Sequence, residues 1–340
     1  MLRIVGVRHK LLSCTLGTLR SVGGFSLVRN SYRRRNSLLI LCYHGLSLGD
    51  EHEWQPSLFM TVQQFRSRLR YLRDAEAAVL PLGQALEMLR QGSLPPRSVV
   101  ITFDDGFVDF AQNALPALSE FGFPSTLYLT THYCKYRIPI SNLVLDYVLW
   151  KSGHAAVELP EYGIDEPMLL GNLQHRREVL QHLRHWMDSK KLDTAGKDEV
   201  ARQIAKSLGV DYAAIHRRRM VQILSPEEVG KISKAGVDVQ LHTHRHRIPL
   251  DPALFTKEIE DNRRAILEFT GRMPVHFCYP SGFYSAPFAS WLKICGVKSA
   301  TTCQNGLALR RSDQMKLPRL LDDSNLDDLR FESAVSGLLV

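Results

Sequence analysis

The chain has 340 residues, of which 44% are hydrophobic and 23% charged, and its formal net charge is +8. These proportions are ordinary for a globular protein, so disorder, collagen-like repeats and coiled coil are excluded as descriptions of the whole chain. No stretch approaches the roughly 20 uninterrupted apolar residues of a membrane-spanning helix. The length suits two ordinary domains or one α/β barrel with an insertion.

The positive charge is concentrated in residues 1–37, which we call the basic leader. This segment holds eight basic and no acidic side chains: Arg3, Arg8, Lys10, Arg20, Arg29, Arg33, Arg34 and Arg35. Residues 38–340 contain as many basic as acidic residues. Such an arm on a neutral body indicates attraction to an anionic membrane surface or polymer, or else a solvated tail.

The leader resembles a secretory signal only weakly. Its apolar stretch, Leu11–Leu19, is interrupted by Ser, Thr and Gly, and no convincing cleavage site follows. The six cysteines include no CxxC pair, and Cys42, Cys278 and Cys295 lie in apolar runs that indicate reduced core residues. We therefore expect a cytoplasmic protein, with peripheral contact to the membrane through the leader as an open alternative.

Short apolar runs alternate with amphipathic segments from residue 38 onward. Leu38–Tyr43 is an apolar run bounded by Gly45, and its length predicts a buried strand. Apolar residues at spacings of three and four predict a helix over 61–75, capped by Thr61. The next predicted elements are a helix at Leu82–Leu89, a strand at Ser98–Phe103, a helix near 109–121 and a strand at Ser125–Thr130. This alternation indicates a parallel sheet or barrel.

The pattern changes between about 135 and 222, where strand signals are rare. Basic, His-rich helical segments such as His175–Trp186 and Lys197–Leu208 dominate, and we interpret the region as a helical insertion in a domain spanning 38–340. Alternation then resumes with a helix at 225–234, a strand at Val237–Leu241, a helix at 252–270, a strand at Val275–Tyr279, a helix at 286–295 and a strand at Lys298–Thr302.

Two adjacent carboxylates, Asp104 and Asp105, follow the predicted strand Ser98–Phe103 and precede Gly106. In a parallel α/β fold the carboxyl ends of the strands open onto the functional face. Like charges this close repel unless a cation or a shared proton relieves them. One carboxylate on a metal with the other free as a base is such an arrangement, and an Asp-Asp-Gly turn is the alternative.

Three histidines follow the predicted strand Val237–Leu241 in the run His242-Thr243-His244-Arg245-His246. His242 and His246 can face one point if the segment turns helically, and neutral imidazole is a common metal ligand. A polar loop is the alternative. Two His and one Asp leave coordination positions open, which is typical of a catalytic metal site. Non-haem iron oxygenases use the same set, but usually with His-X-Asp close together, so hydrolysis is the better interpretation.

Three motifs together carry a family resemblance. TFDDG (Thr102–Gly106), HTHRH (His242–His246) and FCYPSG (Phe277–Gly282) resemble the motifs of the polysaccharide deacetylase family, the NodB-homology domain of carbohydrate esterase family 4. The resemblance runs from about Leu38 to at least Arg319 and treats the helical stretch as an insertion. It implies an α/β fold of the irregular (β/α)7 barrel type and the removal of N-acetyl or O-acetyl groups from sugars.

Carried over residue by residue, the resemblance implies that Asp104 is the catalytic base. It implies further that Asp105, His242 and His246 bind the metal, whereas His244 falls at a variable position and is not counted as a ligand. The implied cofactor is one divalent metal ion, for which zinc is the first choice and nickel, cobalt or iron are the alternatives.

Two departures from the family pattern affect the expected site. An Arg that usually holds the base shortly before Pro-Tyr-Gly is absent here, and the backbone N–H of Ser281 would stand where the oxyanion donor is expected. The usual C-terminal Leu-X-His, which supplies the acid, is also missing. A permuted subgroup resembling the poly-N-acetylglucosamine deacetylases places the acid where His44 stands, although a capped or buried histidine is the alternative. Arg319 could support the base, bind substrate or form a surface salt bridge.

We therefore expect a metal-dependent hydrolase that removes acetyl groups, above all N-acetyl, from a polysaccharide, oligosaccharide or lipid-linked sugar. The alternatives are a deacylase of a small non-carbohydrate amide and a non-catalytic glycan-binding component of a membrane assembly. The expected partner is an acetylated glycan. No nucleic-acid partner is expected, because neither the leader nor Arg217–Arg219 is interleaved with aromatic residues.

Overall fold

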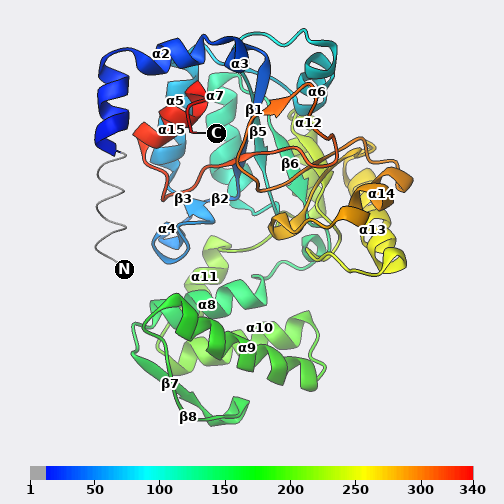
Figure 1. Ribbon diagram of the computed structural model, residues 1–340. Coiled ribbons are helices and arrows are strands. Elements are labelled where there is room, and N and C mark those ends of the chain that lie inside the picture. Colours follow the sequence, from blue (N-terminus) through cyan, green and yellow to red (C-terminus); the bar gives the residue numbers. More distant parts are fainter. Residues whose placement is uncertain (1–12, 340) are drawn as a thin grey trace.

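Seven parallel strands form a barrel in the computed structural model, which describes residues 13–339 (Figure 1). In spatial order the strands are β11 (Ser299–Thr301), β10 (His276–Cys278), β9 (Asp238–Leu241), β6 (Thr126–Leu129), β5 (Ser98–Phe103), β1 (Ser37–Tyr43) and β13 (Leu320–Leu321). β1 pairs in parallel with both β5 and β13. A parallel bridge between Thr301 and Leu317 joins β11 to the segment that leads into β13, so the ring closes. The predicted (β/α)7 barrel is confirmed.

The central strands are apolar because both of their faces are covered. Every residue of β1 and of β5 is buried, as expected for parallel strands with helices outside and side chains within. Two short strands extend the barrel, β12 (Ala308–Leu309) antiparallel to β1 and β4 (Ala78–Val79) parallel to β5. A separate parallel pair, β2 (Gly45–Leu46) and β3 (Phe59–Met60), follows the end of β1.

Six helices of the described barrel occupy the predicted positions. They are α5 (Val62–Asp74), α6 (Leu82–Gln91), α7 (Leu115–Phe121), α12 (Pro226–Lys234), α13 (Pro252–Thr270) and α14 (Ala286–Ile294). Two further helices, α4 (Glu51–Trp54) and α15 (Asp328–Ser336), were not predicted. α5 begins as expected, with the Thr61 hydroxyl accepting the Gln64 N–H, and its apolar stripe is buried. The helix predicted near 109–121 is divided, because a π-helical turn over Phe110–Ala114 precedes α7.

The insertion contains more than helices. Its helices α8 (Ser141–Lys151), α9 (Leu173–Ser189), α10 (Thr194–Ser207) and α11 (Tyr212–Arg218) form a layer below the barrel in Figure 1. An antiparallel hairpin of β7 (Ala156–Leu159) and β8 (Ile164–Leu169) lies between α8 and α9. The prediction of a purely helical insertion is therefore wrong at this point. β8 is mostly exposed, so it lacks the apolar run by which the barrel strands were found.

Part of the basic leader is built into the fold. Residues 13–21 are helical, and α2 (Gly24–Arg29) and α3 (Tyr32–Arg35) follow. α2 contacts α15, and the buried Arg34 donates hydrogen bonds to backbone carbonyls of Ser37, Ser98 and Val335. A solvated tail is therefore the wrong interpretation for the described part, whereas residues 1–12 of the expected leader lie outside the described residues. In the described part of the chain, no helix has the length and apolarity needed to cross a bilayer.

Candidate metal and catalytic site

A cavity of about 610 Å³ opens where the carboxyl ends of the barrel strands meet. Each strand contributes the residues that directly follow it, because parallel strands all end at the same edge. Every site residue expected from the sequence lines this cavity: His44, Asp104, Asp105, His242, His246 and Ser281. The topology therefore brings together residues that lie more than 230 positions apart in the chain.

Asp105, His242 and His246 form a compact cluster of nitrogen and oxygen donors. Asp105 Oδ1 lies 3.2 Å from His242 Nε2 and 3.1 Å from His246 Nε2, and one donor atom from each residue fits within 4.8 Å of the others. His244 is turned away, with its Nδ1 2.9 Å from the Thr131 hydroxyl. The predicted set of two His and one Asp is thus assembled, and the variable histidine is not part of it.

The hydrogen bonding of His242 leaves its second ring nitrogen for the cavity. Its Nδ1 lies 2.9 Å from the carbonyl oxygen of Cys278, which can only accept, so Nδ1 donates this hydrogen bond. Nε2 faces Asp105 Oδ1 at 3.2 Å, and that oxygen is buried without a hydrogen-bond partner. In the neutral tautomer that the Nδ1 hydrogen bond selects, Nε2 presents a lone pair beside the carboxylate, so this donor set fits a divalent metal ion.

The charges within the cluster keep the Asp105 carboxylate ionised. Burial alone would raise the pKa of Asp105, but the imidazoles of His246 and His242 hold it well below its usual range. Burial alone would lower the pKa of His246, but the Asp105 carboxylate raises it. A carboxylate that remains ionised between two imidazoles is a strong ligand for a metal ion.

Backbone strain is concentrated at this site. Positive φ angles occur at Asp105 (67°), Thr243 (61°), His246 (54°) and Ser281 (55°), none of which is glycine. Such conformations cost on the order of 1–3 kcal/mol each and persist only where the surroundings enforce them. Gly106, at φ 91°, has no room for a side chain, because a Cβ there would lie 2.3 Å from Leu129. The sharp turn after β5 therefore aims both carboxylates into the cavity.

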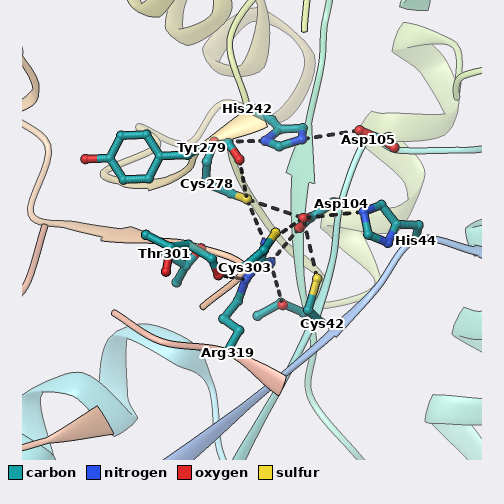
Figure 2. Close-up of polar contacts among 12 residues, drawn as sticks. Cys42, His44, Asp104, Asp105, His242, Cys278, Tyr279, Thr301, Cys303 and Arg319 are labelled. Carbon is teal, nitrogen blue, oxygen red and sulfur yellow. Dashed lines mark hydrogen bonds and ion pairs between the residues drawn. The ribbon is translucent and has the colours of Figure 1, made fainter. Parts of the chain in front are cut away.

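Asp104 is held by a buried guanidinium. Arg319 donates from its two terminal nitrogens to the two Asp104 oxygens, each at 2.7 Å (Figure 2). Arg319 is fully buried and is itself held by the Thr302 carbonyl at 3.0 Å and the Thr102 hydroxyl at 3.2 Å. Burial would raise the pKa of Asp104, yet Arg319 keeps it far below its usual range. The alternative of a surface salt bridge for Arg319 is wrong, because Arg319 is buried against Asp104, the predicted base.

Thiols surround the same carboxylate. Cys278 Sγ lies 3.3 Å and Cys42 Sγ 3.6 Å from Asp104 Oδ2, and Cys303 stands beside Arg319 (Figure 2). Cys42, Cys278 and Cys295 are buried and free, as predicted. The sequence identified Cys42 and Cys278 only as core residues and missed their contact with Asp104. Because a thiol is a weak donor, Arg319 supplies the strong contacts to this carboxylate.

His44 and Ser281 both line the cavity around Asp104. His44 Nε2 is 3.9 Å from Asp104 Oδ2, and its side chain is 15% exposed at the cavity wall. Ser281 lies in the turn after β10, next to Gly282, where a Cβ would come within 2.9 Å of Cys303. These positions bring both residues to the cavity, and their roles as acid and oxyanion donor stay predictions.

Two residues of α13 hold the histidine segment and carry no sequence motif. The buried Asn262 accepts the His242 N–H at 2.9 Å and donates to the Leu129 carbonyl at 3.0 Å. Glu258, one turn earlier, accepts the Arg245 N–H at 2.8 Å. Sequence reasoning missed both residues. The only available signal was their polar character on the buried face of an amphipathic helix.

Comparisons with known proteins agree with this geometry. The sequence profile of the polysaccharide deacetylase family matches residues 91–300, more than half of the chain. The chain is 34% identical to YxkH of Bacillus subtilis over 93 residues, which are 27% of this chain and 31% of that protein. It is 31% identical to the poly-beta-1,6-N-acetyl-D-glucosamine N-deacetylase of Staphylococcus epidermidis over 109 residues, which are 29% of this chain and 38% of that protein.

A solved structure extends the likeness to most of the fold. The Streptococcus pyogenes deacetylase PplD, solved in complex with acetate, matches 86% of this chain and 96% of its own with a TM-score of 0.57. Its sequence identity to this chain is 16%, so this likeness concerns the fold alone. The sequence alignments, by contrast, span only about a third of the length of the curated relatives.

Proposed function

Because the chain belongs to the polysaccharide deacetylase family, we propose that it is a metal-dependent hydrolase that removes N-acetyl groups from a glycan. One observation carries the proposal: Asp104, ionised and fixed by Arg319, stands directly beside the cluster of Asp105, His242 and His246. An oriented carboxylate next to a metal site is what base-assisted hydrolysis requires. The name of the Staphylococcus epidermidis relative supports poly-N-acetylglucosamine or a similar glycan as the substrate.

Asp105, His242 and His246 would hold one divalent ion. Two nitrogens and one oxygen suit zinc, which is our first choice, and they also suit nickel, cobalt or iron. When bound, the ion supplies Lewis acidity toward the acetyl carbonyl and lowers the pKa of a coordinated water. Three protein ligands leave the remaining coordination positions for water and substrate.

The other residues of the cavity would accept a proton, donate a hydrogen bond to the oxyanion and supply a proton. Asp104 accepts a proton from the attacking water, while Arg319 keeps the carboxylate in one orientation. The backbone N–H of Ser281 donates to the developing oxyanion, a contact typically worth ~3–4 kcal/mol of barrier. His44, whose Nε2 lies 3.9 Å from Asp104 Oδ2, protonates the leaving nitrogen and releases acetate and an amino sugar.

Arg319 also bears on the non-catalytic alternative. A glycan-binding module without activity is an alternative because the family's usual arginine before Pro-Tyr-Gly and its usual C-terminal histidine are both missing here. Arg319 provides a guanidinium to Asp104 from the segment before β13 instead. This contact supports an enzyme, and no observation in the described residues favours a binding module or a small-amide deacylase over it.

The remaining expectations continue as proposals. We propose that 38–340 is the catalytic domain, that the protein is cytoplasmic and that the leader contacts the membrane peripherally. The exposed apolar side chains of Val22, Leu27 and Tyr32 in the described part of the leader, together with its basic residues, support membrane contact. The acetylated glycan remains the proposed partner.

Metal content and acetate release, measured on the same preparations, test the proposed function. We expect one equivalent of metal in the wild type and acetate release from N-acetylglucosamine oligomers. His242→Ala should lose both, whereas Asp104→Asn should retain the metal and lose turnover by about 10²-fold or more. His154→Ala, at an exposed position of the insertion, is the control and should behave as the wild type. Full activity of Asp104→Asn would refute this mechanism.

A further inference from the structure

Arg245 places a fixed positive charge in the wall of the cavity. It stands between the ligands His242 and His246, its side chain is 34% exposed, and no step of the mechanism above uses it. Glu258, whose side chain is 3% exposed, accepts the Arg245 backbone N–H at 2.8 Å and one guanidinium nitrogen at 2.9 Å. Because both ends of the residue are bonded to one buried carboxylate, the guanidinium has a defined position relative to the metal cluster.

The single negative charge of Glu258 does not balance the positive charges around it. Arg247 also donates to Glu258 Oε1, at 3.1 Å, so one carboxylate serves two guanidinium groups and one positive charge remains in excess. Lys135, exposed in the loop after β6, adds a further positive charge. The nearby carboxylate of Asp261 is already paired with Lys257 at 2.9 Å. Among the described residues around Glu258, positive charge therefore exceeds negative charge, and Arg245 is the one of these cations that lines the cavity, together with the carboxylates of Asp104 and Asp105.

Arg245 and Lys135 also influence the pKa of the nearby His132. Its ring packs edge-on against His244, next to Arg245. Burial, reinforced by His244, Arg245 and Lys135, lowers the pKa of His132 to about 4. The ring therefore stays neutral near pH 7 and adds no charge of its own, and the field there is that of the arginine and lysine side chains.

We propose that Arg245 selects glycans in which an anionic group, a carboxylate or a phosphate, lies next to the acetylated sugar; this inference rests on the proposed function. Within the described chain, Glu258 takes one of the guanidinium N–H donors of Arg245, so the others remain for a ligand in the cavity. A planar guanidinium recognises carboxylate and phosphate oxygens through paired hydrogen bonds. The anion could belong to a uronic acid in the polymer or to a phosphate at the reducing end of the sugar.

Matched pairs of substrates test the selectivity. Hyaluronan tetrasaccharide and chitotetraose both carry N-acetylglucosamine, but only the first contains a neighbouring carboxylate; UDP-N-acetylglucosamine and free N-acetylglucosamine make the same comparison for phosphate. We expect a higher kcat/KM for the anionic member of at least one pair. Arg245→Gln should lower that anionic-to-neutral ratio about ten-fold or more. Added NaCl should lower the ratio in the wild type.

Two further variants separate selectivity from structural damage. Arg247→Gln removes the same charge from a residue that shares Glu258 but does not line the cavity, so the ratio should stay within about two-fold of the wild type. Arg245→Lys should restore part of the ratio, because the charge returns without the paired donors. Metal content is measured in every variant, since a displaced His242 or His246 would lower turnover of both substrates in a pair.

The outcomes distinguish the inference from the proposed function. Acetate release with equal kcat/KM for charged and neutral substrates, and a ratio that Arg245→Gln leaves unchanged, would overturn the selectivity and leave the deacetylase standing. A preference for the neutral member of both pairs would overturn it as well. Acetate release from none of the four substrates by metal-loaded enzyme would overturn the proposed function, and the inference with it.

Discussion

At the scale of single residues, the proposed chemistry depends most on the ion pair of Asp104 and Arg319. Arg319 keeps the Asp104 carboxylate charged and in one orientation. Both side chains are buried, and both carboxylate oxygens are bonded to the guanidinium. An ion pair of this kind is weak evidence for stability, since desolvation offsets much of the attraction. Its value lies in holding the carboxylate ionised and oriented beside the metal cluster.

Removing the Arg319 guanidinium should therefore damage both folding and turnover. Arg319→Gln leaves Asp104 buried without a counter-charge, and we expect a loss of about 3–5 kcal/mol in the free energy of unfolding, measured with urea. We expect kcat to fall about 10²-fold in Arg319→Lys, which keeps the charge but loses the two-point contact. Metal content should stay at the wild-type level in Arg319→Lys.

Arg310→Gln is the matched control, since this arginine is exposed and lies outside the cavity lining. It should change neither unfolding nor kcat. A wild-type kcat in Arg319→Lys would show that orientation by two hydrogen bonds is unnecessary, and the argument for a fixed base would fail.

The sequence allowed the positions of Asp104, Asp105, His242 and His246 at one site to be predicted, because each lies in a short motif that follows a strand. It left the role of Arg319 open, since 215 residues separate Arg319 from Asp104 and only the closed barrel brings them together. Asn262 and Glu258 were missed for a similar reason. Their function depends on which loop packs against α13, and a helix pattern does not identify that loop.

At the scale of elements, α12 shows how the insertion returns to the barrel. Ser225 and Glu228 form a capping box at its first turn, with Ser225 accepting the Glu228 N–H and Glu228 accepting the Ser225 N–H. Arg219, at the end of α11, pairs with the same Glu228 carboxylate. One glutamate therefore caps a barrel helix and pairs with the residue that ends the last helix of the insertion.

This double role predicts a pH dependence of stability. The Arg219 hydrogen bond lowers the pKa of Glu228 from 4.5 to about 2 in the folded state. A lowered folded pKa contributes stability that is fully present above pH 4.5 and is lost as the pH falls toward 2. Wild type should therefore be more stable than Glu228→Gln at pH 6, and the difference in the free energy of unfolding should be smaller at pH 3, as measured by urea unfolding.

Glu227→Gln provides the comparison, because Glu227 is a neighbouring and more exposed carboxylate in the same helical turn. We expect the free energy of unfolding of Glu227→Gln to differ less from that of wild type, between pH 6 and pH 3, than that of Glu228→Gln does. The free energies of unfolding of wild type and Glu228→Gln could instead differ by the same amount at every pH from 6 to 3. In that case the Arg219 contact would not stabilise the ionised Glu228 carboxylate in the folded protein.

Element prediction succeeded where burial imposes a clear period. Helix α13 has the predicted bounds, and β5 coincides with the predicted apolar run. The hairpin of β7 and β8 was not predicted, because both strands lie outside the barrel, β7 is only four residues long and β8 is mostly exposed. A hydrophobic period reports the packing of an element on a core, so elements on the periphery give little signal.

At the scale of the whole molecule, the described part of the leader connects α15, near the end of the chain, with the strands β1 and β5. Arg34 contacts the carbonyls of Ser37 at the start of β1, Ser98 at the start of β5 and Val335 in α15. Composition alone marked this arginine as one of eight similar charges. Its burial could not be predicted, because it depends on a helix about 300 residues later in the chain.

Arg34→Met should consequently destabilise the entire fold. Three buried carbonyls would lose a charged donor, and we expect the free energy of unfolding to fall by about 2–4 kcal/mol. Arg35→Met, the exposed neighbour, should change it by less than about 0.5 kcal/mol. Differential scanning calorimetry of both variants provides the measurement. Equal effects of the two substitutions would mean that the Arg34 contacts add nothing to stability.

The closing of the barrel also has a consequence for the order in which the protein is made. Asp104 emerges from the ribosome 215 residues before Arg319, and the two meet only where the last strand docks against the first. Contacts between such distant segments form slowly, and until then the carboxylate has no buried counter-charge. Asp105, His242 and His246 are all translated before Arg319. A growing chain can thus complete this cluster before Asp104 gains its counter-charge, so the site that we propose is complete only once synthesis has passed the final barrel strand.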